Sequence, residues 1–514
     1  MGPPKEPAKE SAARPLREDL ARLLELRAAQ LDAARPAAVA KRHAQGRRMA
    51  RENIDAFLDP GSFVEYGMLA RPARADMQGA ADGLVMGTGG VDGAPVAVVA
   101  YDYTVHAGTQ SAINHRKIDR MFEVAARQRL PMVCWLEGGG ARPHDMGVSL
   151  RGSTATFVSF ARLSGLVPTV GIVAGRAFAG NANLAGLCDV LIATKQAVLG
   201  MAGPPLVEAA LGRKFTAEEI GPVEVHVASG AVDILCEDEA EAGRLARQYL
   251  AYFRGPAAPG AAPDGTRLRD IVPENPRRAY NVHRVIEGIA DIGSILELRP
   301  SFGRAAVTSL VRIEGRPVGV VANQPMFLAG AIDSPAADKI ARFIQLCDAY
   351  DIPMLLLCDT PGLMVGPEVE TTALVRHSAR ILTALANATT PFMTLVLRKA
   401  YGLGYYVMGS MPLEPAILLA WPTAEFGGMG LEGAVNIIHK RELEAAPDDA
   451  SRAELHLHHT AALKRSNTAL EVAARFDFDD VIDPAETRAV LARTLKTLPV
   501  PAPRSGRKHP VDPW

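Results

Sequence analysis

Two short glycine-containing stretches of the chain are suited to stabilising negative charge on an oxygen atom. They are Gly175–Gly186 (Gly-Arg-Ala-Phe-Ala-Gly-Asn-Ala-Asn-Leu-Ala-Gly) and Arg398–Gly409 (Arg-Lys-Ala-Tyr-Gly-Leu-Gly-Tyr-Tyr-Val-Met-Gly). Each follows a β-rich run, so we expect a strand, a tight turn and a helix start in both places. The first N–H groups of a helix lack intrahelical acceptors and lie at the positive end of its dipole. The sequence therefore predicts two sites that stabilise an oxyanion.

Neither stretch contains a side chain suited to proton transfer. There is no Asp, Glu or His between Gly171 and Leu187, nor between Arg398 and Met411. A hydratase or isomerase would normally place a carboxylate close to its oxyanion site. The pattern favours a reaction in which the protein stabilises charge and does not supply the base.

The chain is internally duplicated. Lys117-Ile-Asp-Arg-Met-Phe recurs 222 positions later as Lys339-Ile-Ala-Arg-Phe-Ile, and Pro131-Met-Val-Cys-Trp-Leu-Glu recurs at the same offset from Pro353. The two glycine-containing stretches align at an offset of 223. Because several matches follow in one order at nearly one offset, we interpret the chain as two copies of an α/β unit of about 220 residues.

Length and local composition predict two domains. A chain of 514 residues is too long for a single hydrophobic core, and the Pro/Gly/Ala-rich segment Gly255–Gly265 is typical of a linker. We expect a helical arm over residues 1–50, a first domain over 51–262 and a second over 263–514. Each domain alternates short Val/Ile-rich runs with amphipathic helices, which is typical of βα units with buried strands.

Composition argues against several classes of function. Lys and Arg number 56 against 57 Asp and Glu, so the chain has no overall basic surface for nucleic acid. The five cysteines form no Cys-x-x-Cys pair, which argues against a zinc ribbon and for a reducing compartment. No apolar run approaches the roughly 18 residues of a membrane span. We expect a cytoplasmic protein with neither a membrane nor a nucleic-acid partner.

A set of motifs resembles the carboxyltransferase (β) subunits of biotin-dependent acyl-CoA carboxylases, of the acetyl-, propionyl- and methylcrotonyl-CoA carboxylase type. The resemblance covers roughly Glu52 to Arg488. Its motifs occur in family order: Gly139-Gly-Ala-Arg142, Ala322-Asn-Gln-Pro325, Asp359-Thr-Pro-Gly362, Arg398-Lys-Ala-Tyr-Gly402, Ala420-Trp-Pro-Thr-Ala-Glu425 and Met429-Gly-Leu-Glu-Gly-Ala-Val435. The resemblance implies an α/β fold of two tandem crotonase-like domains (ββα spirals) related by internal duplication.

The resemblance implies an enzyme that moves a carboxyl group from carboxybiotin to the α-carbon of an acyl-CoA. Acetyl-CoA and propionyl-CoA are the expected substrates, and methylcrotonyl-CoA remains open. Negative charge would develop on the thioester oxygen and on the ureido oxygen of biotin, which accounts for two oxyanion sites. Biotin would be carried on another subunit, because the sequence contains no Met-Lys-Met biotinylation motif. ATP would be used only by the partner biotin carboxylase, and this chain would bind no metal directly.

The resemblance also implies an assembly. We expect a homohexamer built as a trimer of dimers, which associates with a biotin carboxylase and a biotin carboxyl carrier subunit. The active site would form where the first domain of one subunit faces the second domain of its partner.

The resemblance places the catalytic groups at four backbone amides. The first oxyanion site maps to Gly180 and Asn181 and the second to Leu403 and Gly404. The family has Gly-Gly and Gly-Ala at these positions, so Asn181 and Leu403 are departures. A backbone amide tolerates such a change where the side chain points away from the ligand.

The turn before the first glycine-containing stretch is placed near the CoA thioester. The candidate substrate-binding residues are Gly139, Gly140, Ala141, Arg142 and Lys117. The two cations are candidates for CoA phosphates, and a solvated or ion-paired role is the alternative. Gly138 stands where the family usually has serine.

Three residues are candidates for the biotin pocket and for acyl-chain selection: Gly402, Tyr405 and Tyr406. An aromatic side chain at position 406 can shorten this pocket, and a tyrosine that faces the core is the alternative. His456 and His459 share one face of an expected helix without a third ligand at metal-binding spacing, so we expect a surface helix there.

Two alternatives to a carboxylase remain. A biotin-linked decarboxylase or transcarboxylase would use the same transition state, so residue types cannot separate the direction of the reaction. The non-enzymatic alternative is a catalytically weak scaffold subunit of a carboxylase complex, because Gly138, Asn181 and Leu403 differ from the family pattern.

Overall fold

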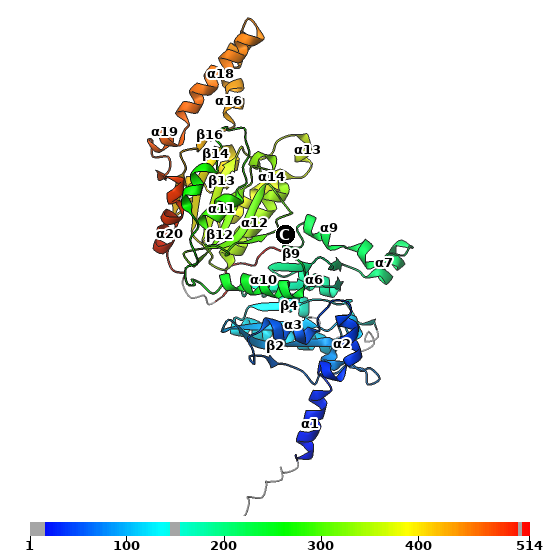
Figure 1. Cartoon of the computed structure of the whole chain (residues 1–514). Coiled ribbons are helices and arrows are strands. Elements are labelled where there is room, and N and C mark those ends of the chain that lie inside the picture. Colours follow the sequence, from blue (N-terminus) through cyan, green and yellow to red (C-terminus); the bar gives the residue numbers. More distant parts are fainter. Residues whose placement is uncertain (1–15, 144–154, 502–505) are drawn as a thin grey trace, which may run out of the picture.

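The computed structural model describes residues 16–143, 155–501 and 506–514. The N-terminal arm contains helices α1 (Glu18–Ala28) and α2 (Pro36–His43), followed by α3 (Ala50–Phe57). Helix α1 buries none of its residues and projects from the body, whereas α3 packs against α10 (Glu239–Tyr252) (Figure 1). Within the described part of the arm, α1 and α2 are helical, and α3, which follows the arm, belongs to the body.

The first half is built on a mixed seven-stranded sheet with the order β1-β2-β3-β4-β5-β7-β9. Its strands are β1 (Val64–Glu65), β2 (Leu84–Val91), β3 (Ala94–Tyr101), β4 (Met132–Trp135), β5 (Thr169–Val173), β7 (Val190–Thr194) and β9 (Ile234–Cys236). The first three pair antiparallel and the rest parallel. Strands β6 (Arg176–Phe178) and β8 (Val198–Gly200) form a separate parallel pair. The further helices are α4 (Ala112–Gln128), α5 (Thr156–Ala161), α6 (Gly180–Gly186), α7 (Pro204–Leu211), α8 (Ala217–Ile220) and α9 (Val223–Ala228).

The second half repeats this plan on a sheet with the order β10-β11-β12-β13-β14-β15-β17, to which β16 adds beside β14. Its strands are β10 (Leu296–Leu298), β11 (Ala306–Ile313), β12 (Arg316–Asn323), β13 (Met354–Thr360), β14 (Phe392–Tyr401), β15 (Ile417–Ala420), β16 (Glu425–Gly427) and β17 (Asp480–Val481). Its helices are α11 (His283–Ile289), α12 (Ser334–Ala349), α13 (Pro367–Glu370), α14 (Leu374–Ala386), α15 (Gly402–Val407), α16 (Leu431–Ile438), α17 (Lys440–Glu444), α18 (Asp449–Ser466), α19 (Ala469–Ala473) and α20 (Thr487–Thr497).

The internal duplication extends to strand register. In the hairpin of β2 and β3, Leu84 lies opposite Tyr101, and in that of β11 and β12, Ala306 lies opposite Asn323. Both residues of the second pair stand 222 positions after those of the first. A one-residue slip would turn every side chain to the other face of the sheet, so this agreement means that the two halves bury equivalent faces.

The repeated lysines have the same structural role in the two halves. The Lys117 Nζ of α4 donates to the carbonyl oxygens of Ala81, at 2.7 Å, and Leu84. The Lys339 Nζ of α12 donates to those of Phe302 and Ala306, at 3.1 and 2.8 Å. Burial lowers the pKa of each lysine to about 8. Each lysine therefore fastens its helix to the start of the neighbouring strand.

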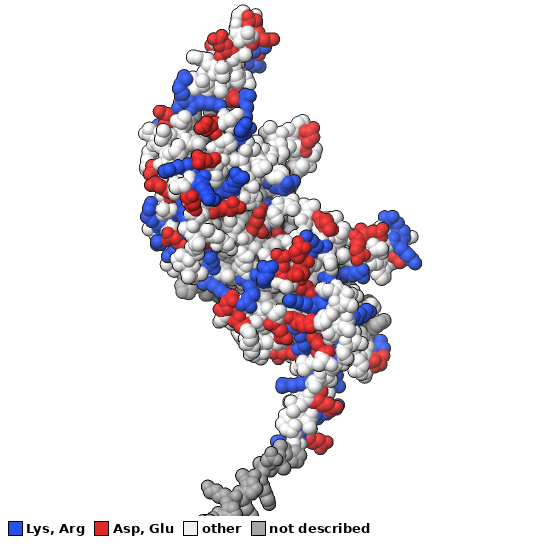
Figure 2. All heavy atoms as spheres, in the orientation of Figure 1, with Lys and Arg blue, Asp and Glu red and all other residues white. Residues whose placement is uncertain are grey.

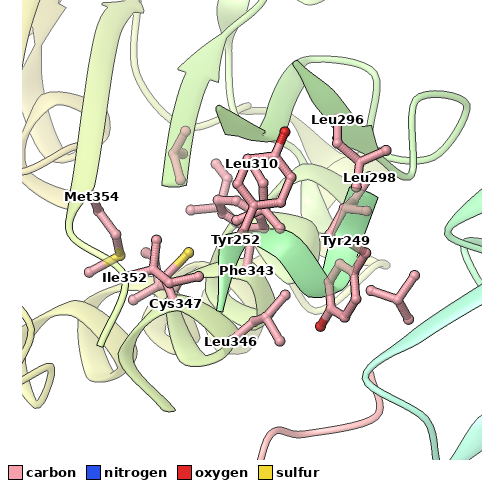
Figure 3. Packing of buried hydrophobic residues seen from close by; sticks show 14 of the residues in the cluster. Tyr249, Tyr252, Leu296, Leu298, Leu310, Phe343, Leu346, Cys347, Ile352 and Met354 are labelled. Carbon is pink, nitrogen blue, oxygen red and sulfur yellow. The ribbon is translucent and has the colours of Figure 1, made fainter. Parts of the chain in front are cut away.

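The hydrophobic core does not divide at the boundary between the halves. Tyr249 and Tyr252 of α10, the last helix of the first half, pack among residues of the second half (Figure 3). These neighbours include Leu298 of β10 and Phe343 of α12. Because one buried cluster contains side chains from both sheets, the two halves form a continuous body.

The surface agrees with the balanced composition. Figure 2 shows cationic and anionic side chains interspersed over the visible face. Among the helices of the described residues, none is both long enough and apolar enough to cross a membrane.

Candidate active site

The first predicted oxyanion position lies where β6 leads into α6. Ala179 precedes the helix with φ 49° and ψ −118°, and its amide donates to the carbonyl of Gly200 at 2.9 Å. Within the described residues, the amides of Gly180 and Asn181 donate to no backbone or side-chain acceptor. Two adjacent N–H groups are thus left for an external oxygen atom.

The second predicted position has the same form at the end of β14. Gly402 has φ 54°, and α15 starts there without an intervening loop. In the described part of the chain, the amides of Leu403 and Gly404 likewise have no protein acceptor. The Leu403 side chain is 54% exposed, so its departure from the family pattern leaves the amide unobstructed.

The two helices are short, which changes the physical argument for charge stabilisation. Helix α6 has seven residues and α15 has six. A macrodipole depends on many aligned peptide units, so two helices of this length contribute little through it. The individual free N–H groups must carry the effect.

The turn expected beside the thioester packs against the start of α6. The Gly140 amide donates to the Asn181 Oδ1 at 3.1 Å, and the Gly140 carbonyl accepts from the Gln110 amide at 2.7 Å. Gly140 has φ 82°, which favours glycine. Gly139 and Ala141 are exposed and stay available to a ligand.

The two cations proposed for CoA phosphates are both buried and engaged within the protein. Arg142 is 3% exposed, and its Nη1 donates to the Asp82 Oδ1 at 2.6 Å. Lys117 is 7% exposed and bonds the two carbonyls described above. The structure therefore favours an ion-paired role for Arg142 and a hydrogen-bonded role for Lys117, because direct contact with a phosphate would require either side chain to leave a buried site.

Each half places a buried acidic residue beside its turn, and our sequence analysis assigned neither of them a role. Glu137 and Asp359, which stand 222 positions apart, each directly precede a candidate turn. The Glu137 carboxylate accepts from Arg42, and the Asp359 Oδ2 accepts from the Arg398 Nε at 3.0 Å. An acidic residue at the same position of both repeats was a signal that could have identified them.

Gln110 is a further residue beside the first oxyanion position. A Cβ placed on Gly180 would lie 2.1 Å from the Gln110 Oε1, so a larger residue at this position would displace the Gln110 side chain. The Gln110 Nε2 donates to the Tyr101 hydroxyl at 3.2 Å, which fixes the side chain. Nothing in the local sequence indicated this contact, because the two residues lie in segments far apart.

The predicted biotin-pocket residues differ in exposure. The Tyr405 ring packs edge-on against Phe426 at 5.6 Å, and burial raises the pKa of the Tyr405 hydroxyl. Tyr406 is 38% exposed. A Cβ built on Gly402 would lie 2.8 Å from the Gly428 carbonyl oxygen. Of the two tyrosines, Tyr406 is the one with surface available to a ligand.

The histidine pair considered for a metal lies on α18, a helix with Thr460 as its one buried residue, so the expected surface helix is confirmed. The His456 Nε2 donates to the Glu432 carbonyl oxygen of α16 at 3.1 Å, whereas His459 lies beside His439 and Glu442. The His439 Nδ1 and His459 Nε2 lie 3.2 and 3.0 Å from the Glu442 Oε2. The two imidazole rings stack at 3.6 Å with their planes 10° apart. Since a metal lies near the plane of each ligating ring, stacked rings cannot share one without rotating.

Comparison with known proteins matches nearly the whole chain. The carboxyl transferase domain family matches residues 41–508. The chain is 38% identical over 474 residues to the methylmalonyl-CoA carboxyltransferase 12S subunit of Propionibacterium freudenreichii subsp. shermanii, covering 89% of this chain and 90% of that one. It is 36% identical to the propionyl-CoA carboxylase beta chain of Saccharopolyspora erythraea, covering 90% and 89%.

Solved structures give the same result. A crystal structure of transcarboxylase 12S, a hexamer with methylmalonyl-coenzyme A bound, superposes with a TM-score of 0.87 at 35% identity, covering 97% of this chain and 99% of that chain. A single-chain, multi-domain long-chain acyl-CoA carboxylase superposes with a TM-score of 0.88 at 48% identity. This chain corresponds to 49% of that longer protein and is itself covered to 94%.

Proposed function

We propose that this chain, which belongs to the carboxyl transferase domain family of biotin-dependent acyl-CoA carboxylases and transcarboxylases, exchanges a carboxyl group between carboxybiotin and propionyl-CoA. The family, the enzyme class and the fold of two tandem crotonase-like domains are confirmed by the family match and the solved structures. Propionyl-CoA is preferred over acetyl-CoA because two of the relatives above, similar over about 90% of the chain, are named for methylmalonyl- and propionyl-CoA, whereas the long-chain acyl-CoA carboxylase makes a longer chain the alternative.

One observation supports the proposal most strongly. The chain presents two pairs of adjacent amides without protein acceptors, Gly180 with Asn181 and Leu403 with Gly404, at equivalent positions of its two halves. A carboxyl transfer develops negative charge on two oxygens in turn, and each needs preorganised donors. A non-catalytic scaffold would have no need to keep both pairs free.

We assign the first pair to the thioester oxygen and the second to the ureido oxygen of biotin. The donor set suits biotin, because a neutral ureido group that gains negative charge is best met by uncharged N–H donors. When bound, carboxybiotin supplies the carboxyl group and a nitrogen that can take the α-proton. The turn Gly139–Ala141 would lie along the thioester. Arg142, which directly follows this turn and pairs with Asp82, would support it from within the protein.

A transcarboxylase is the second candidate, favoured by the similarity to the 12S subunit. It would pass the carboxyl group to biotin on a partner chain and use no ATP itself. In both cases biotin would be carried by a separate carrier subunit, with a biotin carboxylase as a further partner in the carboxylase. The choice of direction belongs to the partners and not to the amides of this chain.

We propose a hexamer of this chain, with the active site between the first half of one subunit and the second half of another. The related 12S subunit is a hexamer. Several large apolar side chains are exposed on the projecting hairpin of α16 and α18, which Figure 1 shows standing off the body. They are Ile437, Ile438 and Leu457, each at least 65% exposed. A second copy of the chain would cover them. We place the protein in the cytoplasm.

The test is an assay of carboxyl transfer with purified protein. Methylmalonyl-CoA and free biotin are incubated with the chain, and the rate of propionyl-CoA formation is measured. The same assay is run with malonyl-CoA and with long-chain carboxylated acyl-CoAs as donors, and the rates of decarboxylated acyl-CoA formation are compared. We expect biotin-dependent formation of propionyl-CoA as the fastest reaction. A faster reaction with malonyl-CoA or with a long chain would change the proposed substrate. No transfer from any of the donors would contradict the proposal.

A further inference from the structure

The two halves of the protein satisfy one equivalent amide with different side chains. In the second half, the Thr360 Oγ1 accepts from the Gly362 amide at 3.1 Å. In the first half, the amide at the same repeat position is that of Gly140, and the Asn181 Oδ1 accepts from it at 3.1 Å. The bond is the same, but its acceptor comes from the turn in one half and from the following helix in the other.

The sequence of each half shows a matching exchange. Thr360 stands 222 positions after Gly138, which has no side chain to offer. Gly404 stands 223 positions after Asn181, so the helix of the second half offers none there. Each half thus has one polar side chain and one glycine at these two positions, in opposite order.

Steric contacts explain why each half has only one side chain at these positions. A Cβ built on Gly138 would lie 2.4 Å from the Asn181 Nδ2 and 2.7 Å from its Cγ. It would also lie 2.3 Å from the carbonyl oxygen of Gly108. In the second half, a Cβ built on Gly404 would lie 2.5 Å from the Gly362 Cα. In the first half a side chain at position 138 would therefore collide with Asn181, and in the second half the Gly362 backbone leaves no room for a side chain at position 404.

The Asn181 side chain is well placed to fix this geometry. It is 0% exposed, and Oδ1 is the atom that bonds Gly140. Its Nδ2 has no hydrogen-bond partner among the described residues, so it contributes by filling the space beside Gly138. A buried donor such as the Gly140 amide would be left unsatisfied if the Oδ1 were removed.

We infer that Asn181 is a positioning residue, which locks the turn Gly138–Ala141 onto the start of α6 and requires glycine at position 138. This inference rests on the proposed function for its catalytic consequence. The turn and the amides of Gly180 and Asn181 would contact the same thioester, so their spacing sets the alignment of the reacting carbon. Gly138 and Asn181, which both differ from the family pattern, are then coupled: the Asn181 side chain replaces the acceptor that a side chain at position 138 would otherwise supply.

The first test measures the turn itself and does not depend on activity. Amide hydrogen exchange of peptides that contain residues 138–142 is compared among wild type, Asn181→Leu and Asn183→Leu. Asn183 lies exposed on the same helix, so it is a matched control. We expect on the order of tenfold faster exchange in the turn for Asn181→Leu and no change for Asn183→Leu. Unchanged exchange in Asn181→Leu would overturn the inference.

The second test is a double-mutant cycle with Gly138→Ser and Asn181→Gly. The readouts are kcat and the KM for free biotin, with methylmalonyl-CoA as donor. We expect each single change to lower kcat by ~10- to 100-fold with the KM for biotin unaltered, because the thioester and not biotin is misplaced. The double variant should lose less than the product of the two single losses, since a serine hydroxyl can accept from Gly140 as Thr360 does from Gly362, although the new Cβ still meets the Gly108 carbonyl.

The double-mutant cycle separates the coupling between positions 138 and 181 from the steric cost of a side chain at position 138. The contact of a new Cβ with the Gly108 carbonyl is present with either residue at position 181, so it cancels in the coupling. Additive losses would contradict the inference, as would a fall in melting temperature without a change in kcat. If wild type shows no transfer at all, the proposed function fails, and the exchange measurement alone decides whether Asn181 positions the turn.

Discussion

Arg42 of the N-terminal arm donates from Nη1 to the Glu137 Oε1 at 3.0 Å, one residue before the turn Gly138–Ala141. Both side chains are 8% exposed. Glu239 of α10 lies 3.8 Å from the same guanidinium. The neighbouring carboxylates raise the pKa of Arg42. The arm is therefore fastened directly behind the candidate active site.

Replacing Arg42 by Met should destabilise the protein strongly. Two buried carboxylates would lose their cation, which typically costs about 3–5 kcal/mol. Urea unfolding measures this change. Arg22→Met is the control, because Arg22 pairs with Glu25 on the exposed α1 and should matter by less than about 1 kcal/mol. Equal effects of the two substitutions would contradict the assigned role of the arm.

Lys339 should make stability depend on alkaline pH. Its pKa is about 8 in the folded protein, below the ordinary value of 10.5. Between these values the unfolded chain binds more protons, so the free energy of unfolding should rise with pH, by at most about 1.4 kcal/mol per pH unit for this residue. Below pH 8 the contribution should be constant.

The measurement for Lys339 compares wild type with Lys339→Met in urea unfolding at pH 8 to 10. The variant loses the donor to Phe302 and Ala306 at every pH, so only the difference in slope reports titration. Wild type should gain stability relative to the variant as the pH rises. Parallel curves would show that the buried ammonium does not titrate in this range.

Tyr406 should limit the length of the acyl chain. It is exposed at the helix that carries the second pair of amides, and Tyr406→Ala would enlarge the space beside them. We expect relative kcat/KM for butyryl-CoA and longer substrates to rise by roughly tenfold over propionyl-CoA. Phe476→Ala is a control, since that aromatic side chain is 77% exposed elsewhere. An unchanged profile in Tyr406→Ala would remove this role.

The cluster of His439, Glu442 and His459 should not bind zinc. The stacked rings leave no nearby position that lies in both imidazole planes. The Glu442 carboxylate already lies within 3.2 Å of one ring nitrogen of each histidine. Addition of Zn²⁺ should shift the melting temperature of wild type no more than that of His459→Ala. A zinc-dependent increase in wild type alone would show that a ring rotates to form a site.

The sequence allowed the duplicated fold to be predicted, and the structure leaves free the backbone amides that the sequence proposed for the site. Repeats separated by one offset impose equivalent strands, and the lysines at 117 and 339 show this at the level of single hydrogen bonds. The amides of Gly180 and Leu403 follow from the same logic, because a strand that turns directly into a helix leaves its first N–H groups unbonded.

Contacts between distant segments escaped prediction. Arg142 was considered for phosphate binding, but its guanidinium forms an ion pair with Asp82, sixty positions earlier in the chain. The bond between Asn181 and Gly140 and the approach of His439 to His459 have the same cause. Spacing along the chain shows which side chains share a helix face. It does not show which loops are folded against that face.

The account depends most on the backbone amides, and Leu403 allows them to be tested without disturbing the core. Leu403→Pro removes one N–H in the first turn of α15, where proline is tolerated, whereas Leu403→Ala keeps it. With methylmalonyl-CoA and free biotin, the proline variant should lose roughly a hundredfold or more in kcat, and the alanine variant should stay close to wild type. Full activity in folded Leu403→Pro, or an equal loss in both variants, would contradict the claim that these amides stabilise the transferring state.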